Sequence, residues 1–314
     1  MARAGLNPWV DWQSYRAVVR LFRAHQPDVV LAYTVKPVIY GGMAARKLGS
    51  TRFYPMITGL GYAFTEGGGL NRKAVRTLMQ GLYRRGLATA NAVIFQNPDD
   101  EALFRALELQ PEDTPSARVH GSGVDLDAFP PIPLPDAPVF LMLARLVADK
   151  GVFEYVAAAR QIKQRYPNAV FRLAGALDSN PASIEADELK AWVEEGVIEY
   201  LGNVRPVQTA LAACRFYVLP SYREGTPRSV LEALATGRPV ITTDTPGCRE
   251  TVVNGENGLL VPPRDAEALF VAMIKLLEMP AADIQRMAEA SLALARDKYD
   301  VHKVNAEILK VMRL

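Results

Sequence analysis

Short apolar runs and amphipathic helical patterns alternate along the whole of this chain. Runs such as 28–33 and 139–144 are short and rich in apolar residues, as buried strands are, and each is followed by a stretch with helical periodicity. Strands that alternate with helices in this way predict βαβ units, which place parallel strands side by side. The sequence therefore predicts an α/β fold built on parallel sheets.

The same pattern places the remaining elements. Further strands are predicted over 53–57, 92–95, 118–120, 169–174, 197–201, 216–219, 240–243 and 259–261. Helices are predicted over 12–24, 38–48, 70–88, 154–165, 185–195 and 301–312, and another begins at Asn97, where a capping residue precedes a proline and three acids.

A proline-rich segment predicts where the chain divides. Residues 130–138 contain five prolines in nine positions, which is typical of a stiff linker. The length of 314 residues suffices for two domains, each with its own core. We therefore expect one domain over 1–135 and a second over 136–314, with the last helix able to cross back to the first domain.

Composition limits the classes of partner. Cys214 and Cys248 have no metal-ligand spacing, and two thiols in a chain of this size indicate a reducing, cytoplasmic environment. No apolar run is long enough to span a membrane.

The charges are unevenly distributed along the chain. Residues 1–97 contain 13 Lys and Arg but only three Asp and Glu, which indicates an anionic partner. A nucleic acid is not favoured, because no basic patch is interleaved with aromatic residues.

The segment 222–239 combines a turn with the start of a helix. The preceding run 216–220 predicts a buried strand, and Pro227 suits the first position of the helix, where a missing N–H is tolerated. Gly225 and Thr226 then place backbone N–H groups at the N-terminus of a helix, which favours an anion.

Two carboxylates, Glu224 and Glu232, lie eight positions apart in this segment. Glu224 follows the strand at its carboxyl end, where open α/β sheets bind ligands. Glu232 lies about one and a half turns into the helix and could reach a diol such as a ribose. The alternative is that both are ordinary surface acids, with Glu224 interacting with the helix dipole.

A second constellation follows the first strand after the prolines. Arg145 can bind phosphate through two hydrogen bonds, and Lys150 adds a point charge, so together they suit a diphosphate. Two solvated cations in a loop are the alternative for this pair considered alone.

Four segments in a fixed order carry a family resemblance. The segments are G-S-G-V-D-L-D-A-F at 121–129, A-R-L-V-A-D-K-G at 144–151, E-G-T-P-R-S-V-L-E-A at 224–233 and N-G-E-N-G-L-L-V-P-P at 254–263. With these segments the chain resembles the retaining nucleotide-sugar glycosyltransferases of the group 1 type (glycosyltransferase family 4), and particularly the subgroup that builds bacterial surface polysaccharides and lipid-linked oligosaccharides. That resemblance implies the GT-B fold, with two Rossmann-like domains.

The resemblance assigns roles to residues in these segments. It implies that Arg145 and Lys150 bind the donor diphosphate and stabilise its charge as the glycosidic bond breaks. Glu224 is implied to act at the donor sugar or phosphate, with retention by front-face attack. The other implied contacts are Glu232 with the ribose, the backbone of Gly225, Thr226 and Pro227 with the sugar or phosphate, Gly123 with the donor through its backbone, and Val204 with the base.

No cofactor or metal is expected. Asp125 and Asp127 form a D-x-D pattern, which is a metal signature in another glycosyltransferase fold. Here it follows a glycine-rich turn, so capping of that turn is the favoured interpretation. No cluster of His and Cys predicts a metal site elsewhere in the sequence.

The first domain departs from the family pattern. Members usually begin with a strand and a glycine-rich loop, whereas this chain begins with a helix, so we expect its first domain to be incomplete at the N-terminus. Lys36 is a candidate contact to an acceptor phosphate, with a solvated lysine as the alternative. The basic helix Leu70–Leu87 could lie on an anionic membrane beside a polyprenyl-diphosphate acceptor, on the inner face of the plasma membrane. The alternative is that this helix packs on the core.

The predicted function is the transfer of a sugar from a nucleotide-diphosphate sugar, UDP-linked by expectation, to a lipid-linked or polysaccharide acceptor. Two other functions stay open at this point. One is a GT-B sugar-nucleotide epimerase or phosphorylase, which requires different catalytic residues. The other is an inactive remnant that binds nucleotide sugar without transferring it.

Overall fold

The chain divides into two compact units. The computed structural model describes residues 8–60, 70–177 and 182–314. Unit 1 comprises Met1–Gly121 and Ala306–Leu314, and unit 2 comprises Ser122–Asn305. The proline-rich segment 130–138 therefore belongs to unit 2.

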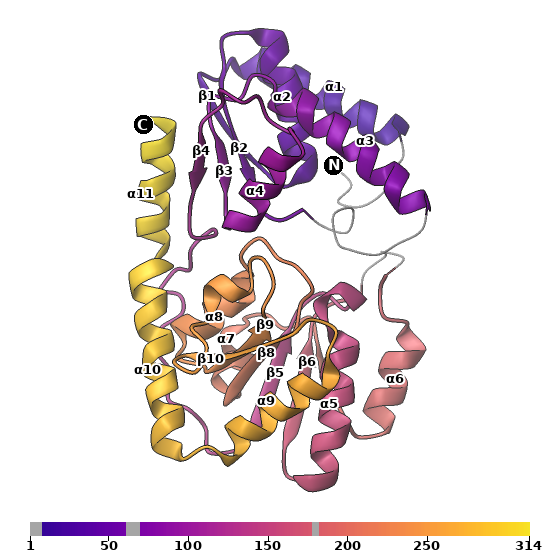
Figure 1. The fold of residues 1–314 in the computed structure, drawn as a ribbon, viewed down its shortest axis with the longest axis vertical. Helices are drawn as coiled ribbons and strands as arrows, with labels where there is room; N and C mark the ends of the chain where they lie inside the picture. Colours follow the sequence, from indigo (N-terminus) through magenta and orange to yellow (C-terminus); the bar gives the residue numbers. More distant parts are fainter. Residues whose placement is uncertain (1–7, 61–69, 178–181) are drawn as a thin grey trace. The chain divides into compact units, whose positions relative to one another are not determined.

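Unit 1 is built on a sheet of four parallel strands in the order β1-β2-β3-β4 (Figure 1). The strands are β1 (Val29–Tyr33), β2 (Arg52–Ile57), β3 (Val93–Phe95) and β4 (Ser116–Arg118). The helices are α1 (Pro8–His25), α2 (Val35–Leu48), α3 (Leu70–Leu87) and α4 (Pro98–Ala106).

The helix α4 begins as the sequence predicts. The side chain of Asn97 accepts a hydrogen bond of 2.8 Å from the backbone N–H of Asp100, and Pro98 follows at the first helical position. Three acids in the first turn face the positive end of the helix dipole. The expected capping of this helix is confirmed.

Two glycines bring α2 and α3 into close contact. A Cβ atom added to Gly42 would lie 1.7 Å from the carbonyl oxygen of Gly86, and one added to Gly86 would lie 2.7 Å from the Cα atom of Ile39. No side chain fits at either position without moving a helix backbone. This contact fixes α3 against the core of unit 1.

The apolar side of α3 is largely used within unit 1. Tyr83 and Leu87 are buried, and Met79 and Leu82 pack against the same core. The guanidinium of Arg84 donates to the carbonyl oxygens of Leu107 and Glu108, the two residues that follow α4. Of the two interpretations of this basic helix, the core-packed one agrees with these contacts.

Lys36 at the start of α2 is paired within unit 1. Its Nζ lies 2.6 Å from Oδ1 of Asp11 on α1, and both side chains are about four-fifths buried. This ion pair therefore ties α1 to α2. Asp11 also lies near Tyr40 of α2, whose pKa is raised to about 12 by burial and by the charge of Asp11.

Unit 2 is built on six parallel strands in the order β10-β9-β8-β5-β6-β7. The strands are β5 (Val139–Leu143), β6 (Val170–Ala174), β7 (Glu199–Gly202), β8 (Phe216–Leu219), β9 (Val240–Thr243) and β10 (Gly258–Val261). The helices are α5 (Val152–Arg165), α6 (Ala186–Glu194), α7 (Gln208–Ala212), α8 (Arg228–Ala235), α9 (Ala266–Glu278) and α10 (Ala281–Lys298), with 3-10 turns η2 (Ala148–Lys150) and η3 (Arg249–Thr251). The last helix, α11 (Val301–Met312), begins in unit 2 and ends in unit 1.

The centre of this sheet is apolar on both faces. Every residue of β5 and β8 is buried, as expected for parallel strands covered by helices on both sides. The ring of Phe140 lies 5.1 Å from that of Phe171 and 4.9 Å from that of Phe216. This packing gives the loops at the ends of the strands a rigid base.

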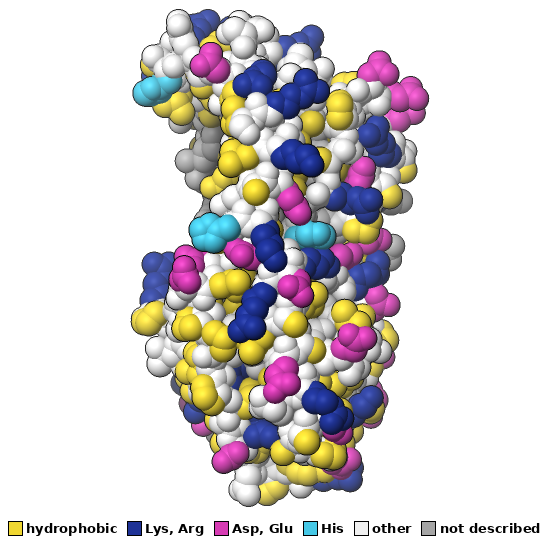
Figure 2. All heavy atoms as spheres, turned by 90° about the vertical axis from the view of Figure 1, so that its left-hand side faces the viewer, with side chains coloured by type: hydrophobic (Ala, Val, Ile, Leu, Met, Phe, Trp, Pro, Cys, Tyr) yellow, Lys and Arg dark blue, Asp and Glu magenta, His cyan; other side chains and the backbone are white. Residues whose placement is uncertain are grey.

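The helix α11 contributes residues to both units. It buries a single stripe, formed by Val304, Ile308 and Met312, which repeats every four residues. Figure 2 shows the face that α10 and α11 present to solvent, where Lys and Arg side chains are interspersed with Asp and Glu.

The segment before β5 is anchored to unit 2. Two nitrogens of the buried Arg238 donate to the carbonyl oxygens of Ile132 and Pro133, and Arg215 donates to that of Pro135. The prolines therefore run along unit 2, held by arginine side chains. None of the described helices is both long and apolar enough to span a membrane.

The Gly42–Gly86 contact predicts the effect of Gly42→Ala. The added methyl group meets a backbone oxygen, so we expect the free energy of unfolding to fall by about 1–3 kcal/mol or more. Urea unfolding measures this change. Gly81→Ala on α3 is the control, because no atom lies within 4 Å of the added methyl group. It should be neutral or stabilising by up to about 1 kcal/mol. Equal effects of the two substitutions would contradict the packing argument.

Candidate active site at the carboxyl edge of the six-stranded sheet

The predicted site residues of unit 2 gather where its parallel strands end. Because β5 and β8 are neighbours and parallel, the loops that follow them leave the sheet at one edge. The first loop carries Arg145 and Lys150, and the second carries Glu224. Lys150 and Glu224 are thereby brought together although they are 74 residues apart.

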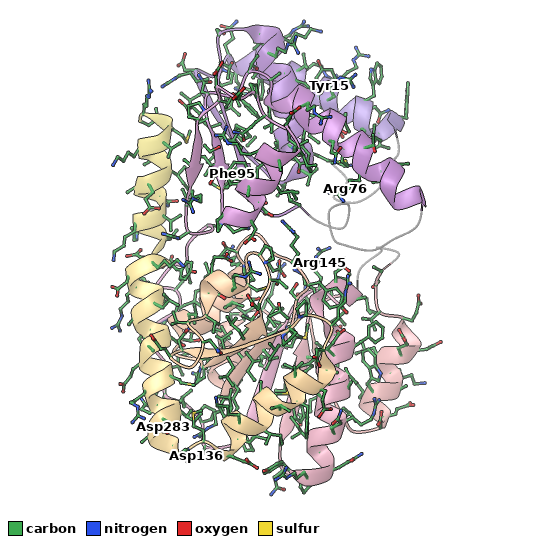
Figure 3. All side chains as sticks on the ribbon, viewed as in Figure 1. Tyr15, Arg76, Phe95, Asp136, Arg145 and Asp283 are labelled. Atoms are coloured by element: carbon green, nitrogen blue, oxygen red, sulfur yellow. The ribbon has the colours of Figure 1, made fainter. Side chains whose placement is uncertain are left out.

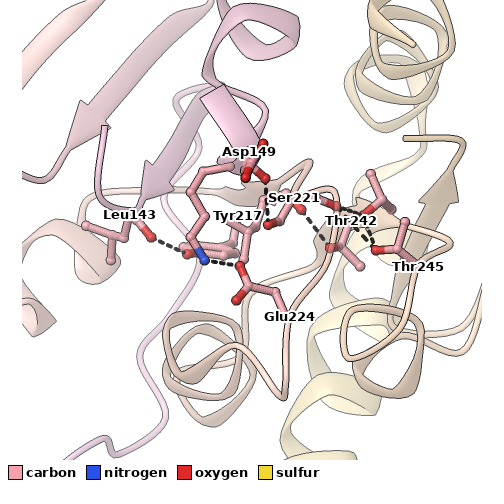
Figure 4. Close-up of polar contacts among 10 residues, drawn as sticks. Leu143, Asp149, Tyr217, Ser221, Glu224, Thr242 and Thr245 are labelled. Atoms are coloured by element: carbon pink, nitrogen blue, oxygen red, sulfur yellow. Dashed lines mark hydrogen bonds and ion pairs between the residues drawn. The ribbon is translucent and has the colours of Figure 1, made fainter. Parts of the chain in front are cut away.

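An ion pair joins the ammonium of Lys150 to Oε1 of Glu224 (Figure 4). Their side chains are only 19% and 14% exposed. Because both side chains are largely sheltered from water, the loss of one partner leaves the other charge poorly solvated. The structure thus places two opposite, fixed charges side by side at the sheet edge.

Hydrogen bonds tie the two loops together beneath this ion pair. The carbonyl oxygen of Asp149 accepts from the backbone N–H of Tyr222 at 2.9 Å and from the hydroxyl of Ser221 at 3.1 Å. A Cβ atom added to Gly151 would lie 2.1 Å from the carbonyl oxygen of Pro220. The position of Lys150 relative to Glu224 is therefore set by backbone contacts on either side of them.

A buried threonine network supports the same loop from β9. Thr242 donates to the carbonyl oxygen of Leu219 at 2.7 Å, and Thr243 and Thr245 both donate to that of Ser221 (Figure 4). The three threonines are buried. Their hydroxyls give the carbonyl oxygens of Leu219, at the end of β8, and of Ser221 hydrogen-bond partners within the protein.

Tyr222 is held from two sides. Its hydroxyl donates to the carboxylate of Glu154 on α5 at 2.6 Å, and the guanidinium of Arg264 lies 4.7 Å from the centre of its ring. Burial, followed by the bond to Glu154, raises the pKa of Tyr222 well above its ordinary value. The phenol therefore stays protonated at neutral pH.

The turn after β9 closes against Glu224. The backbone N–H of Glu224 donates to the carbonyl oxygen of Pro246 at 3.0 Å. A Cβ atom added to Gly247 would lie 2.4 Å from the carbonyl oxygen of Glu224 and 2.2 Å from that of Gly225. Gly247 also has a φ of 84°, which favours glycine. Only glycine allows this approach.

The helix α8 begins one residue later than predicted. Pro227 is its N-cap, not its first helical residue, and Gly225 and Thr226 precede it. Pro227 has an extended ψ of 110°, so it ends the loop and does not start the helix. The two residues still lie at the N-terminal end of α8.

Glu232 is buried on α8 at 8% exposure. Its Oε1 lies 3.0 Å from Nε of Arg228, one turn earlier on an exposed position. Burial raises the pKa of Glu232, and the charge of Arg228 partly opposes that rise. A carboxylate kept in such a position is unfavourable for stability, which favours a binding role.

Arg145 and Val204 lie on the same edge of the sheet. Arg145 is exposed on the loop after β5 (Figure 3), and Val204 follows β7 and packs against the core. Gly175 allows the loop before Arg145 to pass close by, because an added Cβ atom would lie 1.7 Å from the carbonyl oxygen of Ala144. The structure brings both residues to the carboxyl ends of the strands.

Gly123 has a packing reason of its own. An added Cβ atom would lie 2.6 Å from the Cα atom of Val301, and its φ is 70°.

The turn that follows Gly123 is capped by Asp125, whose Oδ1 accepts from the backbone N–H groups of Asp127 and Ala128, each at 3.0 Å. The prediction that Asp125 caps this turn is confirmed.

Among the described residues, no three His, Cys, Asp or Glu side chains form a group that could hold a metal ion.

Sequence reasoning missed the residues that support the site from β9. Thr242, Thr243 and Thr245 lie on or after a buried strand, and Gly247 follows a Thr-Pro pair. Polar residues within a strand that is otherwise apolar were the available signal. Their role depends on the pairing of β9 with β8, and the local sequence does not specify which strands are neighbours.

Two family models match the chain. The model described as glycosyl transferases group 1 matches residues 137–279, and the model described as glycosyl transferase 4-like matches residues 9–97. Together they cover most of both units.

Two curated relatives match most of the chain. An N,N'-diacetylbacillosaminyl-diphospho-undecaprenol alpha-1,3-N-acetylgalactosaminyltransferase of Campylobacter jejuni is 29% identical over 291 residues, which are 88% of this chain and 75% of that protein. A UDP-Gal:alpha-D-GlcNAc-diphosphoundecaprenol alpha-1,3-galactosyltransferase of Escherichia coli is 26% identical over 287 residues, which are 85% and 71% of the two chains.

Among solved structures, sucrose-phosphate synthase from Thermosynechococcus elongatus is similar with a TM-score of 0.83 at 22% identity. The match covers 99% of this chain and 80% of that chain. At this level of identity the similarity shows the fold alone, which is the GT-B fold of two domains on parallel sheets.

The burial of Glu232 predicts a pH-dependent effect of Glu232→Gln. Because its pKa is raised in the folded chain, ionisation above that pKa reduces stability, and the reduction disappears below the ordinary glutamate pKa of about 4.3. We therefore expect the variant to be more stable than the wild type near pH 8, with the difference shrinking towards about pH 4. Urea unfolding at both pH values measures it.

Arg228→Gln is the matched control for this effect. It removes the charge that opposes the pKa rise of Glu232, so it should lower stability near pH 8. A gain from Glu232→Gln that is equal at both pH values would point to side-chain shape and against charge.

Proposed function

Because the chain belongs to the glycosyl transferases group 1 family and has the GT-B fold, we propose that it is a retaining glycosyltransferase that moves a sugar from a nucleotide-diphosphate sugar to a lipid-linked or polysaccharide acceptor. The observation that carries the proposal is the partly buried ion pair of Lys150 and Glu224 at the carboxyl edge of the six-stranded sheet. This edge is where open α/β sheets bind ligands.

The charges of this pair match those that develop during transfer. As the glycosidic bond breaks, positive charge grows on the sugar and negative charge on the departing diphosphate. Lys150 stabilises the diphosphate, and the carboxylate of Glu224 stabilises the sugar. Charges fixed in advance, in a site sheltered from water, lower the barrier because they need not reorganise.

The remaining predicted contacts bind the nucleotide. Arg145 adds a second cation that can hold the diphosphate through two hydrogen bonds. The N-terminal end of α8, with Gly225 and Thr226 before it, favours the same anion. Glu232 follows on α8, and its buried carboxylate accepts hydrogen bonds from ribose hydroxyls. We propose that these cations make a metal unnecessary.

The relatives support the choice of substrates. The names of both relatives specify acceptors linked to undecaprenol through a diphosphate, and one specifies UDP-galactose as donor. We propose a UDP-sugar as the donor and a polyprenyl-diphosphate-linked sugar as the acceptor, in bacterial surface glycan synthesis in the cytoplasm. The family assignment favours transfer over epimerisation, phosphorolysis or binding without turnover.

For an acceptor of this kind, α3 offers a charged face. Its apolar residues Met79 and Leu82 pack in unit 1, so we propose that exposed Arg76 and Arg85 attract anionic headgroups without insertion of the helix. Peripheral binding to a membrane is then electrostatic and weakens as salt is added.

Loss of either member of the ion pair is expected to remove turnover. Lys150→Ala and Glu224→Ala should each lower kcat by about 100-fold or more, because each removes a charge fixed for the transition state. The assay follows UDP release and glycolipid formation from UDP-sugars and a bacterial lipid extract. Arg160→Ala, which breaks the exposed pair of Arg160 with Glu195, is the control and should keep wild-type kcat. Wild-type rates in the first two variants would refute the site.

Charge reversal on α3 tests the membrane proposal. The double variant Arg76→Glu and Arg85→Glu should bind vesicles with anionic lipid at least about tenfold more weakly than the wild type. The reason is that each Lys or Arg near an anionic surface contributes about 1 kcal/mol to the binding free energy. Co-sedimentation with vesicles at low salt measures the binding. Arg286→Glu on α10 is the control, and equal losses in both proteins would exclude a specific role of α3.

A further inference from the structure

Glu250 connects two separate parts of unit 2. It lies in η3, the 3-10 turn that follows β9. Its carboxylate Oε2 accepts a hydrogen bond of 2.7 Å from the backbone N–H of Gly247. Its backbone carbonyl oxygen accepts from Nζ of Lys298 at 2.8 Å and from the hydroxyl of Tyr299. One residue is thus bound on one side to the turn after β9 and on the other to the end of α10.

The first connection leads to the active-site carboxylate. Gly247 lies so close to the backbone of Glu224 that a Cβ atom does not fit between them, and Pro246 accepts the N–H of Glu224. The turn at 246–247 is therefore the surface on which the backbone of Glu224 rests. When Glu250 fixes the N–H of Gly247, it fixes that surface.

The second connection leads to the places where the chain enters and leaves unit 2. The carbonyl oxygen of Tyr299 accepts from the N–H of Val124 at 2.7 Å, and the N–H of Val301 donates to the carbonyl oxygen of Val124 at 3.0 Å. Val124 comes soon after Ser122, the first residue of unit 2, and Val301 begins α11, which leaves it. The entry of the chain at Val124 is thus bonded to Tyr299, which also binds Glu250, and the exit at Val301 is bonded to Val124.

We propose that Glu250 is a positioning residue for Glu224, through which the end of α10 sets the geometry of the Glu224–Lys150 pair. The inference rests on the proposed function for its effect on rate, but the hydrogen bonds carry the mechanical link by themselves. Tyr299 is 1% exposed, and Lys298 lies with its Nζ 5.0 Å from the centre of the Tyr299 ring. A buried phenol and a partly buried ammonium that donate to the same carbonyl oxygen give the link a defined geometry.

Three substitutions separate the parts of this link. Glu250→Ala removes the acceptor of the Gly247 N–H, whereas Glu250→Gln keeps an oxygen in its place. Tyr299→Phe removes the hydroxyl bound to the Glu250 carbonyl and keeps the buried ring. Glu256→Ala, an exposed acid in the next turn, is the control.

The first measurement is hydrogen exchange at the amide of Glu224, with the amide of Val218 in β8 as the internal reference. We expect Glu250→Ala to accelerate exchange at Glu224 by about tenfold or more while Val218 is unchanged, because only a local opening is made easier. Tyr299→Phe should do so to a smaller degree, and Glu250→Gln should stay within about threefold of the wild type.

The second measurement is the rate of transfer. A displacement of Glu224 by about 1 Å can lower kcat by about 100-fold, so Glu250→Ala should lose about 10–100-fold in kcat with little change in KM for the nucleotide sugar. Glu250→Gln should recover most of it. These values are to be normalised to folded protein.

Several results would overturn the proposal. One is wild-type exchange at Glu224 in Glu250→Ala, and another is equal acceleration at Val218, which would show general destabilisation. A wild-type kcat in Glu250→Ala would also overturn the proposal. If Glu250→Ala does not fold, the test is Tyr299→Phe, in which exchange at Glu224 as slow as in the wild type would overturn the proposal. An inactive wild-type protein would refute the proposed function instead, while exchange still tests the link.

Discussion

The parallel pairing of β5 with β8 is the contact on which the site depends. It places the ends of two strands side by side, and the loops that follow them carry Lys150 and Glu224. Neighbouring strands lie about 4.8 Å apart, so loops that leave two neighbouring strands at the same end start within reach of each other. The apolar centre formed by Phe140, Phe171 and Phe216 keeps this pairing fixed.

The same edge concentrates interactions that are unfavourable for stability by themselves. The partly buried ion pair and the buried carboxylate of Glu232 each carry a desolvation cost that opposes the stability provided by the core. Arg228 beside Glu232 compensates for part of this cost. Such a concentration of sheltered charges at one edge is typical of a functional site.

The sequence predicts local structure and individual site residues better than it predicts their partners. The helix Leu70–Leu87 and the strand 216–219 follow from periodicity, because each is encoded by adjacent residues. The pairing of Lys150 with Glu224 depends on the strand order β9-β8-β5, which no local pattern specifies. Long-range contacts are hidden in the same way: the prolines at 130–138 predict a linker, and no local pattern shows that Arg238, far along the chain, donates to the carbonyl oxygens of Ile132 and Pro133 in that segment.

Lys36 shows the same limit in unit 1. The sequence offers it as a contact for an acceptor phosphate, but its ammonium lies 2.6 Å from the carboxylate of Asp11. The ammonium of a lysine has three N–H donors, so a phosphate that binds Lys36 has to lie beside a carboxylate that is already in place. Because that carboxylate partly neutralises the charge of Lys36, the lysine attracts an incoming anion less strongly than a solvated lysine would. The same ion pair holds α1 on α2, so it has a structural role whether or not an anion binds.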